Sequence, residues 1–293
     1  MLTVFLQQGI NGIVVGSLYV LVALGLTLIY GVLVQINFAH ADIVTIGAFV
    51  AYFITHWLSG DYFVGIAAAL IVGGVLGWLL NAAIFKPLRD STNELLPLIA
   101  TIGVSIMLQN AMLLLLGPIP YAFSTPYSNQ VIRFDGMFFT LQSLLIIAMS
   151  AVAVGLLYAF MKFTFLGKAL RAVSQDRETA GLMGINPNYL IMLTFVIASA
   201  LAGMGGAMLG PVLVLTPFAG TSVIVKAFAI VIIGGFGNVE GTIIAGLIVG
   251  LIESYTTQFL DPGLIDIVVF ALLLLTLAVR PTGLIAERRE ENV

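Results

Sequence analysis

Long apolar runs recur along the whole chain, and they constrain its fold more than any other feature. A helix needs roughly 20 apolar residues to cross the hydrocarbon core of a bilayer. Runs of about that length occupy most of the 293 residues, and the charged residues gather in the short stretches between them. The pattern therefore predicts an all-α fold, a polytopic transmembrane helical bundle.

Two of the predicted spans, 43–58 and 222–236, are short for a crossing, so we expect about eight or nine spans with some helices broken. The remaining spans are predicted at residues 5–34, 62–85, 95–117, 141–162, 189–214, 241–259 and 264–280. They form one transmembrane domain over 1–293. Its longest polar loops are 118–140 on one side and 163–187 on the other.

The composition excludes several classes of function. Hydrophobic residues make up 60% of the chain and charged residues 9%, against about 25% charged residues in soluble domains. The net charge of −3 gives no reason to expect a nucleic-acid partner. The chain has no cysteine, and its two histidines, His40 and His56, are too far apart for a local metal motif. No HExxH motif is present, so we expect neither a metal site nor an enzyme.

Basic residues predict the orientation of the spans. Nine of the eleven Lys and Arg residues lie at 86–89, 162–177 and 280–289, and nine crossings place these three segments on one side. The positive-inside rule makes that side cytoplasmic. We therefore expect the N-terminus outside and the C-terminus in the cytoplasm.

Glycines at a spacing of four predict close packing of helices. Such pairs are Gly12/Gly16, Gly73/Gly77, Gly206/Gly210, Gly237/Gly241 and Gly246/Gly250. Lipid offers no hydrophobic drive for helices to pair, so small residues that let backbones approach become the packing device. These pairs predict a tight bundle and say nothing about a substrate.

The inner loop 163–187 is predicted to contain an amphipathic helix over 168–184, which Gly184 and Pro187 end. Such a helix can lie on the membrane surface or dock in a partner's groove. No GxxxxGK[ST] motif occurs in the chain, so active transport would take ATP hydrolysis from another protein. Residues expected to couple to that protein are Lys168, Arg171, Asp176, Arg177, Glu178, Ala180 and Gly184.

The segment Glu178-Thr179-Ala180, followed after three residues by Gly184, resembles the EAA---G loop of ABC-importer permeases. The surrounding string ALRAVSQDRETAGLMGIN resembles the permease subunits of high-affinity branched-chain amino acid importers, of the LivH type. Three further stretches resemble the same family, at Gly25–Asp42, Lys226–Ser254 and Arg280–Leu284. Ala41-Asp42 stands where the family commonly has Gly-Glu, so the acid is kept but shortened.

The resemblance implies a permease domain in a bacterial inner (plasma) membrane that imports leucine, isoleucine and valine by alternating access. It implies four kinds of partner: a second permease subunit, two cytoplasmic ATPase subunits, an external solute-binding protein and the amino acid substrate. The second permease subunit could be a related chain or a second copy of this one. ATP and Mg²⁺ would bind the ATPase subunits, and this chain would hold no cofactor. Urea, short amides or other amino acids remain alternative substrates. An autonomous secondary transporter or channel is the alternative from another class.

Ionisable groups in or beside membrane spans are candidates for the translocation pathway. Asn37, His40 and Asp42 follow the first long span and could bind the ammonium and carboxylate of an amino acid. The alternative is an ordinary cytoplasmic turn in which His40 and Asp42 are solvated or paired with each other. Lys226 and Glu253 could pair across the bundle, and a structural role is favoured for both.

Two interruptions of the apolar pattern occupy similar places in the two halves of the chain. Phe38-Ala39 and Phe218-Ala219 stand about 180 residues apart, and the spans before them run in opposite directions. Paired broken helices of this kind point to a midplane site between inverted repeats. We therefore expect the two halves to have inverted, related folds.

Overall fold

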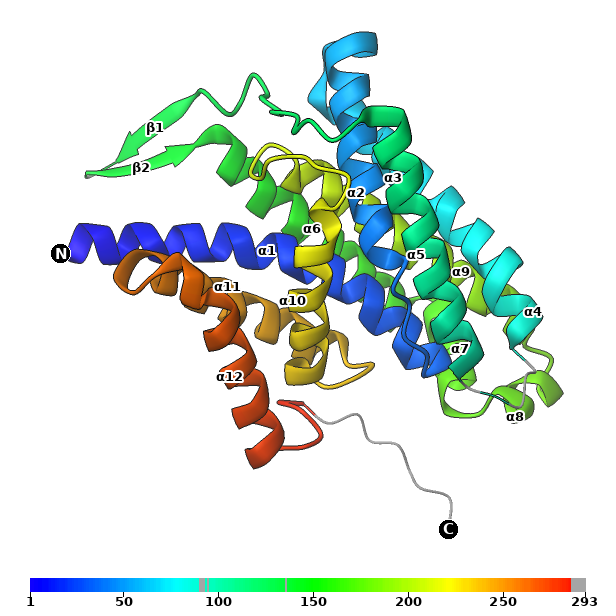
Figure 1. The fold of residues 1–293 in the computed structure, drawn as a ribbon. Coiled ribbons are helices and arrows are strands. Elements are labelled where there is room, and N and C mark those ends of the chain that lie inside the picture. Colours follow the sequence, from blue (N-terminus) through cyan, green and yellow to red (C-terminus); the bar gives the residue numbers. More distant parts are fainter. Residues whose placement is uncertain (90–92, 94, 135, 286–293) are drawn as a thin grey trace.

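The computed structural model describes residues 1–89, 93, 95–134 and 136–285. Helices dominate this part of the chain (Figure 1). They are α1 (Leu2–Leu33), α2 (His40–Phe53), α3 (Tyr62–Leu80), α4 (Lys86–Leu88), α5 (Leu95–Leu116), α6 (Leu141–Phe163), α7 (Phe165–Gln175), α8 (Arg177–Leu182), α9 (Pro187–Leu209), α10 (Ala219–Gly234), α11 (Val239–Phe259) and α12 (Ile265–Val279). A π-helical turn, Ile54–Ser59, extends α2, and another, Asn81–Phe85, joins α3 to α4.

Eight helices in the described residues are long and apolar enough to cross a membrane, so the chain is a multi-pass membrane protein. Helix α10 is apolar but has only 16 residues. The predicted span 43–58 is part of a 19-residue segment, His40–Leu58, which includes the π-helical turn. The predicted span 222–236 is the short α10. The expectation of eight or nine spans with short members is confirmed.

Contacts between distant segments define two ends of the bundle. At one end, the hairpin end, Gln7 Nε2 donates to the Phe138 carbonyl over 2.8 Å, and Tyr121 exchanges backbone hydrogen bonds with Leu215. This end carries a two-stranded antiparallel sheet of β1 (Val131–Phe134) and β2 (Met137–Thr140). The sheet lies in the predicted polar loop 118–140, where the sequence predicted only a loop.

The opposite end, which carries α7 and α8, is called the α7–α8 end. Here Arg89 donates to the side chain of Asn188, and Gly31 lies against Gly237. The described basic residues of all three predicted inner segments lie at this end, as nine alternating crossings require. The positive-inside rule can be applied to these three segments together only because they lie at the same end of the bundle.

Helices α2 and α10 begin inside the bundle, because each follows a stretch of non-helical chain that runs back from the end of the preceding helix. Helix α1 ends at Leu33, yet the Nε2 atom of His40 lies 3.2 Å from the carbonyl oxygen of Val22. Val22 stands about 16 Å from Leu33 along the helix axis, at 1.5 Å per residue. Residues 34–39 therefore return beside α1 to the interior before α2 starts.

The N-termini of the two short helices meet. The backbone N–H of Gly220, in the first turn of α10, donates to the Thr45 hydroxyl of α2 over 2.9 Å. Phe38 and Phe228 lie with their ring centroids 5.4 Å apart. Thr45 meets Gly220, and the earlier residue Phe38 meets the later residue Phe228. The contacts therefore run in opposite directions along the two segments, so the two short helices are antiparallel.

The two halves of the chain repeat one pattern of helix pairing. Helix α1 packs on α10 and α11, and α9 packs on α2 and α3. The pairs α2·α3 and α10·α11, and likewise α2·α5 and α10·α12, are also both present. Helices α1 and α9 touch and are antiparallel, because Gly25 approaches Ala198 whereas Val22 approaches Gly205. The pairing follows the arrangement that inverted repeats require.

Glycines lie at the crossings of these helices, as their spacing predicts. A Cβ atom built on Gly12 would stand 2.7 Å from the Cα of Leu251, and Gly16 approaches Leu247 in the same α1–α11 crossing. Gly73 and Gly77 of α3 approach the backbone of α9 in the corresponding crossing of the other half. Small residues thus bring helix backbones into contact at equivalent places in both halves.

Candidate functional site

The polar loop after α6 forms an elbow of two short helices at the α7–α8 end. Helix α7 is capped by Thr164, which accepts from the Gly167 N–H over 3.0 Å, and buries Ala169, Leu170 and Val173. A single helix over 168–184 was predicted, and that prediction is wrong. The chain is extended at Asp176 (φ −149°), and a second helix, α8, starts there.

Asp176 makes the break, because it caps α8 instead of continuing α7. Its carboxylate accepts from the Glu178 and Thr179 N–H groups over 2.9 and 3.0 Å, and from the Thr179 hydroxyl. These hydrogen bonds, that of the Thr179 hydroxyl foremost, hold the pKa of the Asp176 carboxyl below its usual value. An ionised cap at a helix N-terminus fixes the angle of the elbow.

Most of the residues predicted to couple to an ATPase lie on the elbow surface. Lys168, Asp176 and Glu178 are exposed, and Ala180 is buried against the bundle. The others lie in the same elbow: Arg171 donates to the Met161 carbonyl, Arg177 to the Asn188 side chain over 3.4 Å, and Gly184 has a φ of +82°.

Apolar side chains are also exposed on the elbow. Leu182 and Met183, at the end of α8, are 88% and 79% exposed, and Phe165 at the start of α7 is 78% exposed. Ionised groups beside exposed apolar groups are typical of a surface that another protein covers. The polar residues of this surface were predicted from the sequence, whereas the direction of these apolar side chains depends on the break at Asp176.

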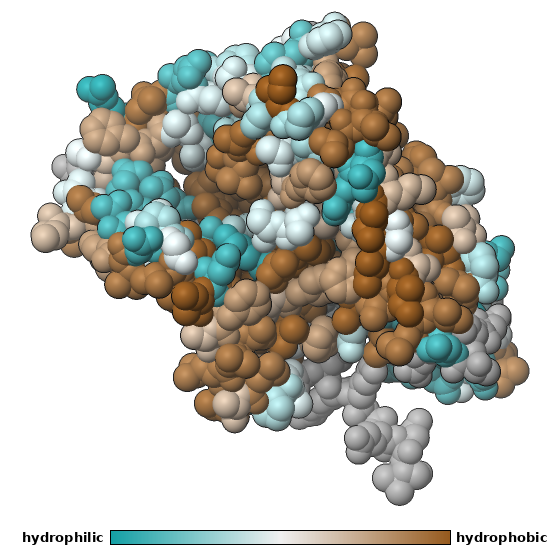
Figure 2. Space-filling model, viewed as in Figure 1, coloured by the Kyte–Doolittle hydropathy of each residue, from teal (hydrophilic) through white to brown (hydrophobic). Residues whose placement is uncertain are grey.

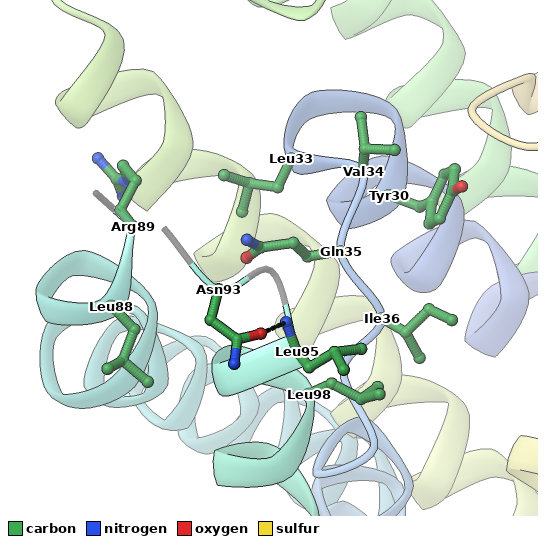
Figure 3. A pocket seen from close by; sticks show the side chains of 10 residues that line it. All are labelled: Tyr30, Leu33, Val34, Gln35, Ile36, Leu88, Arg89, Asn93, Leu95 and Leu98. Atoms are coloured by element: carbon green, nitrogen blue, oxygen red, sulfur yellow. Dashed lines mark hydrogen bonds between the residues drawn. The ribbon is translucent and has the colours of Figure 1, made fainter. Parts of the chain in front are cut away.

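A cavity of about 640 Å³ opens at the same end of the bundle, between α1, residues 34–36 and the start of α5 (Figure 3). Its polar lining is Gln35, Arg89 and Asn93, and the Asn93 side chain accepts from the Leu95 N–H over 3.0 Å. Tyr30 and aliphatic side chains line the remainder. No sequence motif pointed to this cavity, since its walls come from segments about 60 residues apart.

The polar group at the start of α2 is buried. Asn37, His40 and Asp42 are each at most 1% exposed, so the interpretation as a solvated cytoplasmic turn is wrong. His40 contacts the Val22 carbonyl, and the Asp42 carboxyl faces Ser105 and Gln109 of α5. Neither amide atom of Asn37 has a hydrogen-bond partner among the described residues. In this state a solute cannot reach the three side chains.

Lys226 and Glu253 form the ion pair that the sequence suggested. The Lys226 Nζ lies 2.7 Å from the Glu253 Oε1 and 3.1 Å from the Tyr19 hydroxyl, so the pair joins α10, α11 and α1. The two side chains are 14% and 15% exposed. In the described part of the chain, no group of three His, Cys, Asp or Glu residues could hold a metal ion.

Comparison with known proteins gives one consistent family. A profile described as "Branched-chain amino acid transport system / permease component" matches residues 9–277. The LivH permease protein of the high-affinity branched-chain amino acid transport system of Salmonella typhimurium is 36% identical, over 99% of this chain and 98% of its own. The BraD permease protein of the corresponding Pseudomonas aeruginosa system is 34% identical, with the same coverage.

A weaker relative is the LivM permease protein of the same Salmonella system, 22% identical over 94% of this chain and 69% of its own. No solved structure gives a significant match. Every match is to a permease, and the two stronger relatives are matched over nearly their whole length.

Proposed function

Because the chain belongs to the family of branched-chain amino acid transport permease components, we propose that it is the membrane-spanning permease subunit of an ATP-driven, binding-protein-dependent importer of leucine, isoleucine and valine. Similarity over 99% of the chain to permeases named for these solutes is the observation that carries the proposal. The helical bundle supplies the transmembrane path, and the chain acts as a transport subunit and not as an enzyme.

The partners follow from what this chain does not contain. The sequence has no P-loop, so ATP and Mg²⁺ bind separate ATPase subunits on the cytoplasmic side, while an external binding protein delivers the amino acid. A second permease subunit completes the path. The similarity to two differently named permeases of one Salmonella system supports a pair of related chains rather than two identical copies.

The elbow of α7 and α8 is the coupling element in this proposal. It joins α6 to α9, and α9 packs directly on α1, α2 and α3. A push on the exposed Leu182 and Met183 is thereby transmitted to the helices that surround the start of α2. We assign this end to the cytoplasmic side of a bacterial inner membrane, with the N-terminus outside, and the basic residues that gather here support the assignment.

Reconstitution with the ATPase subunits and the binding protein tests the proposal. Leu182→Ser with Met183→Ser removes apolar contact at the elbow, and Glu178→Ala removes an exposed charge there. We expect the first variant to lose copurification with the ATPase and the second to lose binding-protein-stimulated ATP hydrolysis. Asp261→Asn, at an exposed position of the hairpin end, is the control and leaves both unchanged.

Two results would refute the proposal. One is uptake of leucine into liposomes by the purified chain alone, driven by an ion gradient, which is the behaviour of a secondary transporter. The other is transport of urea or short amides, with no uptake of branched-chain amino acids, by the assembled complex.

A further inference from the structure

The Lys226–Glu253 pair lies deep in the membrane-spanning region. Tyr19 and Glu253 each stand about 21 Å from the α7–α8 ends of α1 and α11, at 1.5 Å per residue. The hydrocarbon core of a bilayer is about 30 Å thick. The pair therefore lies within the hydrocarbon core, about 9 Å from the surface at the hairpin end, where a charged side chain is costly unless it meets water or protein.

The pair is only partly covered by its own chain. About one seventh of each side chain is accessible, at 14% and 15%. Thr221 and Ser222 of α10 and Thr257 of α11 are exposed nearby on the same helices. Figure 2 shows hydrophilic side chains over the hairpin half of α1 and the adjoining part of α11, whereas most of the surface over α12 and much of the surface over α3 and α5 is hydrophobic. The pair thus borders a polar face that is unsuited to lipid.

The pair has unused bonding capacity. An ammonium group has three donors, and Lys226 uses two of them, on Glu253 and Tyr19. The second carboxylate oxygen of Glu253 is buried and has no hydrogen-bond partner in the part of the chain that the structure describes. One ammonium and one carboxylate, each with unused bonding capacity, therefore lie together beside Tyr19.

We propose that Lys226 and Glu253 bind the charged head group of a zwitterionic amino acid as it crosses the membrane. Lys226 takes the substrate carboxylate, and Glu253 takes the substrate ammonium. Without substrate, each of the two charges is compensated by the other. A zwitterion can then replace both contacts at once, so neither charge is left unpaired. This inference rests on the proposed function and adds the residues that recognise what all the substrates share.

An exchange of this kind selects the head group and not the side chain. Leucine, isoleucine and valine have identical head groups, so a site built from two opposite charges serves all three equally. A neutral amide has no charged carboxylate and cannot separate the resting pair. The site therefore passes zwitterions and rejects uncharged solutes of similar size.

The experiment compares neutral and exchanged pairs in the full reconstituted complex, with leucine as the probe. The double variant Lys226→Met/Glu253→Gln removes both charges and leaves no buried charge unpaired. The exchanged variant Lys226→Glu/Glu253→Lys keeps an ion pair but reverses its direction. Thr27→Val/Thr242→Val is the matched control, because it removes a 2.7 Å contact between α1 and α11 whose two side chains are at most 1% exposed.

We expect leucine uptake to fall at least tenfold in both pair variants, while copurification with the ATPase subunits and basal ATP hydrolysis stay at wild-type levels. The threonine control retains uptake. A purely structural pair predicts the opposite, namely that the double neutral or the exchanged variant transports leucine like the wild type, and either result overturns the inference. Failure of the wild-type chain to assemble with an ATPase would instead count against the proposed function.

Discussion

The contact between Gly47 and Gly203 gives a prediction whose sign follows from geometry. A Cβ atom added to Gly47 of α2 would stand 2.6 Å from the Cα of Gly203 and 2.8 Å from its carbonyl carbon. Ordinary carbon contacts start at about 3.5 Å, so α9 must move by roughly 1 Å. Both groups are backbone, and neither can rotate away. We therefore expect Gly47→Ala to be destabilising.

The magnitude is the difference of two effects. Overpacking a well-packed crossing costs about 1–3 kcal/mol, and replacing a helical glycine by alanine returns up to about 1 kcal/mol. With the full gain subtracted, Gly47→Ala loses up to about 2 kcal/mol, and we expect the upper part of that range because the obstructing groups are backbone. Gly103→Ala in α5 is the matched control, because its added methyl group has nothing within 4 Å and the change should be neutral or stabilising.

Thermal unfolding of the purified variants in detergent measures the difference. We expect Gly47→Ala to unfold several degrees below the wild type and Gly103→Ala at or above it. A Gly47→Ala protein that unfolds at the wild-type temperature, while Gly103→Ala behaves as expected, would show that α2 and α9 do not cross at these glycines.

Three further predictions concern single polar groups and one turn. Thr45→Val leaves the buried Gly220 N–H without its acceptor and should cost about 1–3 kcal/mol of stability, whereas Thr45→Ser should be nearly neutral. If thermal unfolding shows that both variants lose the same stability, the hydrogen bond is excluded. The lowered pKa of Asp176 means that its ionised form stabilises the fold at neutral pH, and that this contribution is lost as the pH falls below about 4. Asp176→Asn should therefore flatten the pH dependence of thermal unfolding in that range. An unchanged profile would refute the capping role. Gly184→Ala places a side chain at φ +82° and should reduce ATPase coupling through strain in the elbow, with Gly181→Ala, in ordinary helical backbone, as the control; equal coupling in both would argue against it.

The sequence predicted the membrane spans well, because span length and apolar content are local properties. It also predicted the pairing of Lys226 with Glu253, since two opposite charges in apolar spans have few other partners. It did not predict the break at Asp176. The periodicity on either side continues through that residue, and only the capping hydrogen bonds reveal that the carboxylate ends one helix and starts another.

The burial of Asn37, His40 and Asp42 was outside the reach of local patterns. Their polarity reads as a solvated turn until residues 34–39 are seen to run back along α1. The exposure of Leu182 and Met183 was missed for a related reason, because whether a side chain points toward the bundle or away from it depends on the tertiary fold. A polar residue in a membrane protein is therefore informative about burial only after the path of the backbone is known.

The meeting of α2 and α10 has a further consequence for motion. A continuous helix would run as one rigid element from one membrane surface to the other. Here, two short helices meet at mid-depth instead, and they belong to different halves of the chain. We expect each short helix to tilt separately about the Thr45–Gly220 contact, because the two belong to different halves of the chain. Exchanging the tilts of the two short helices would convert a passage open to one compartment into its counterpart open to the other, and the glycine contacts of α2 with α9 would have to shift with the tilt.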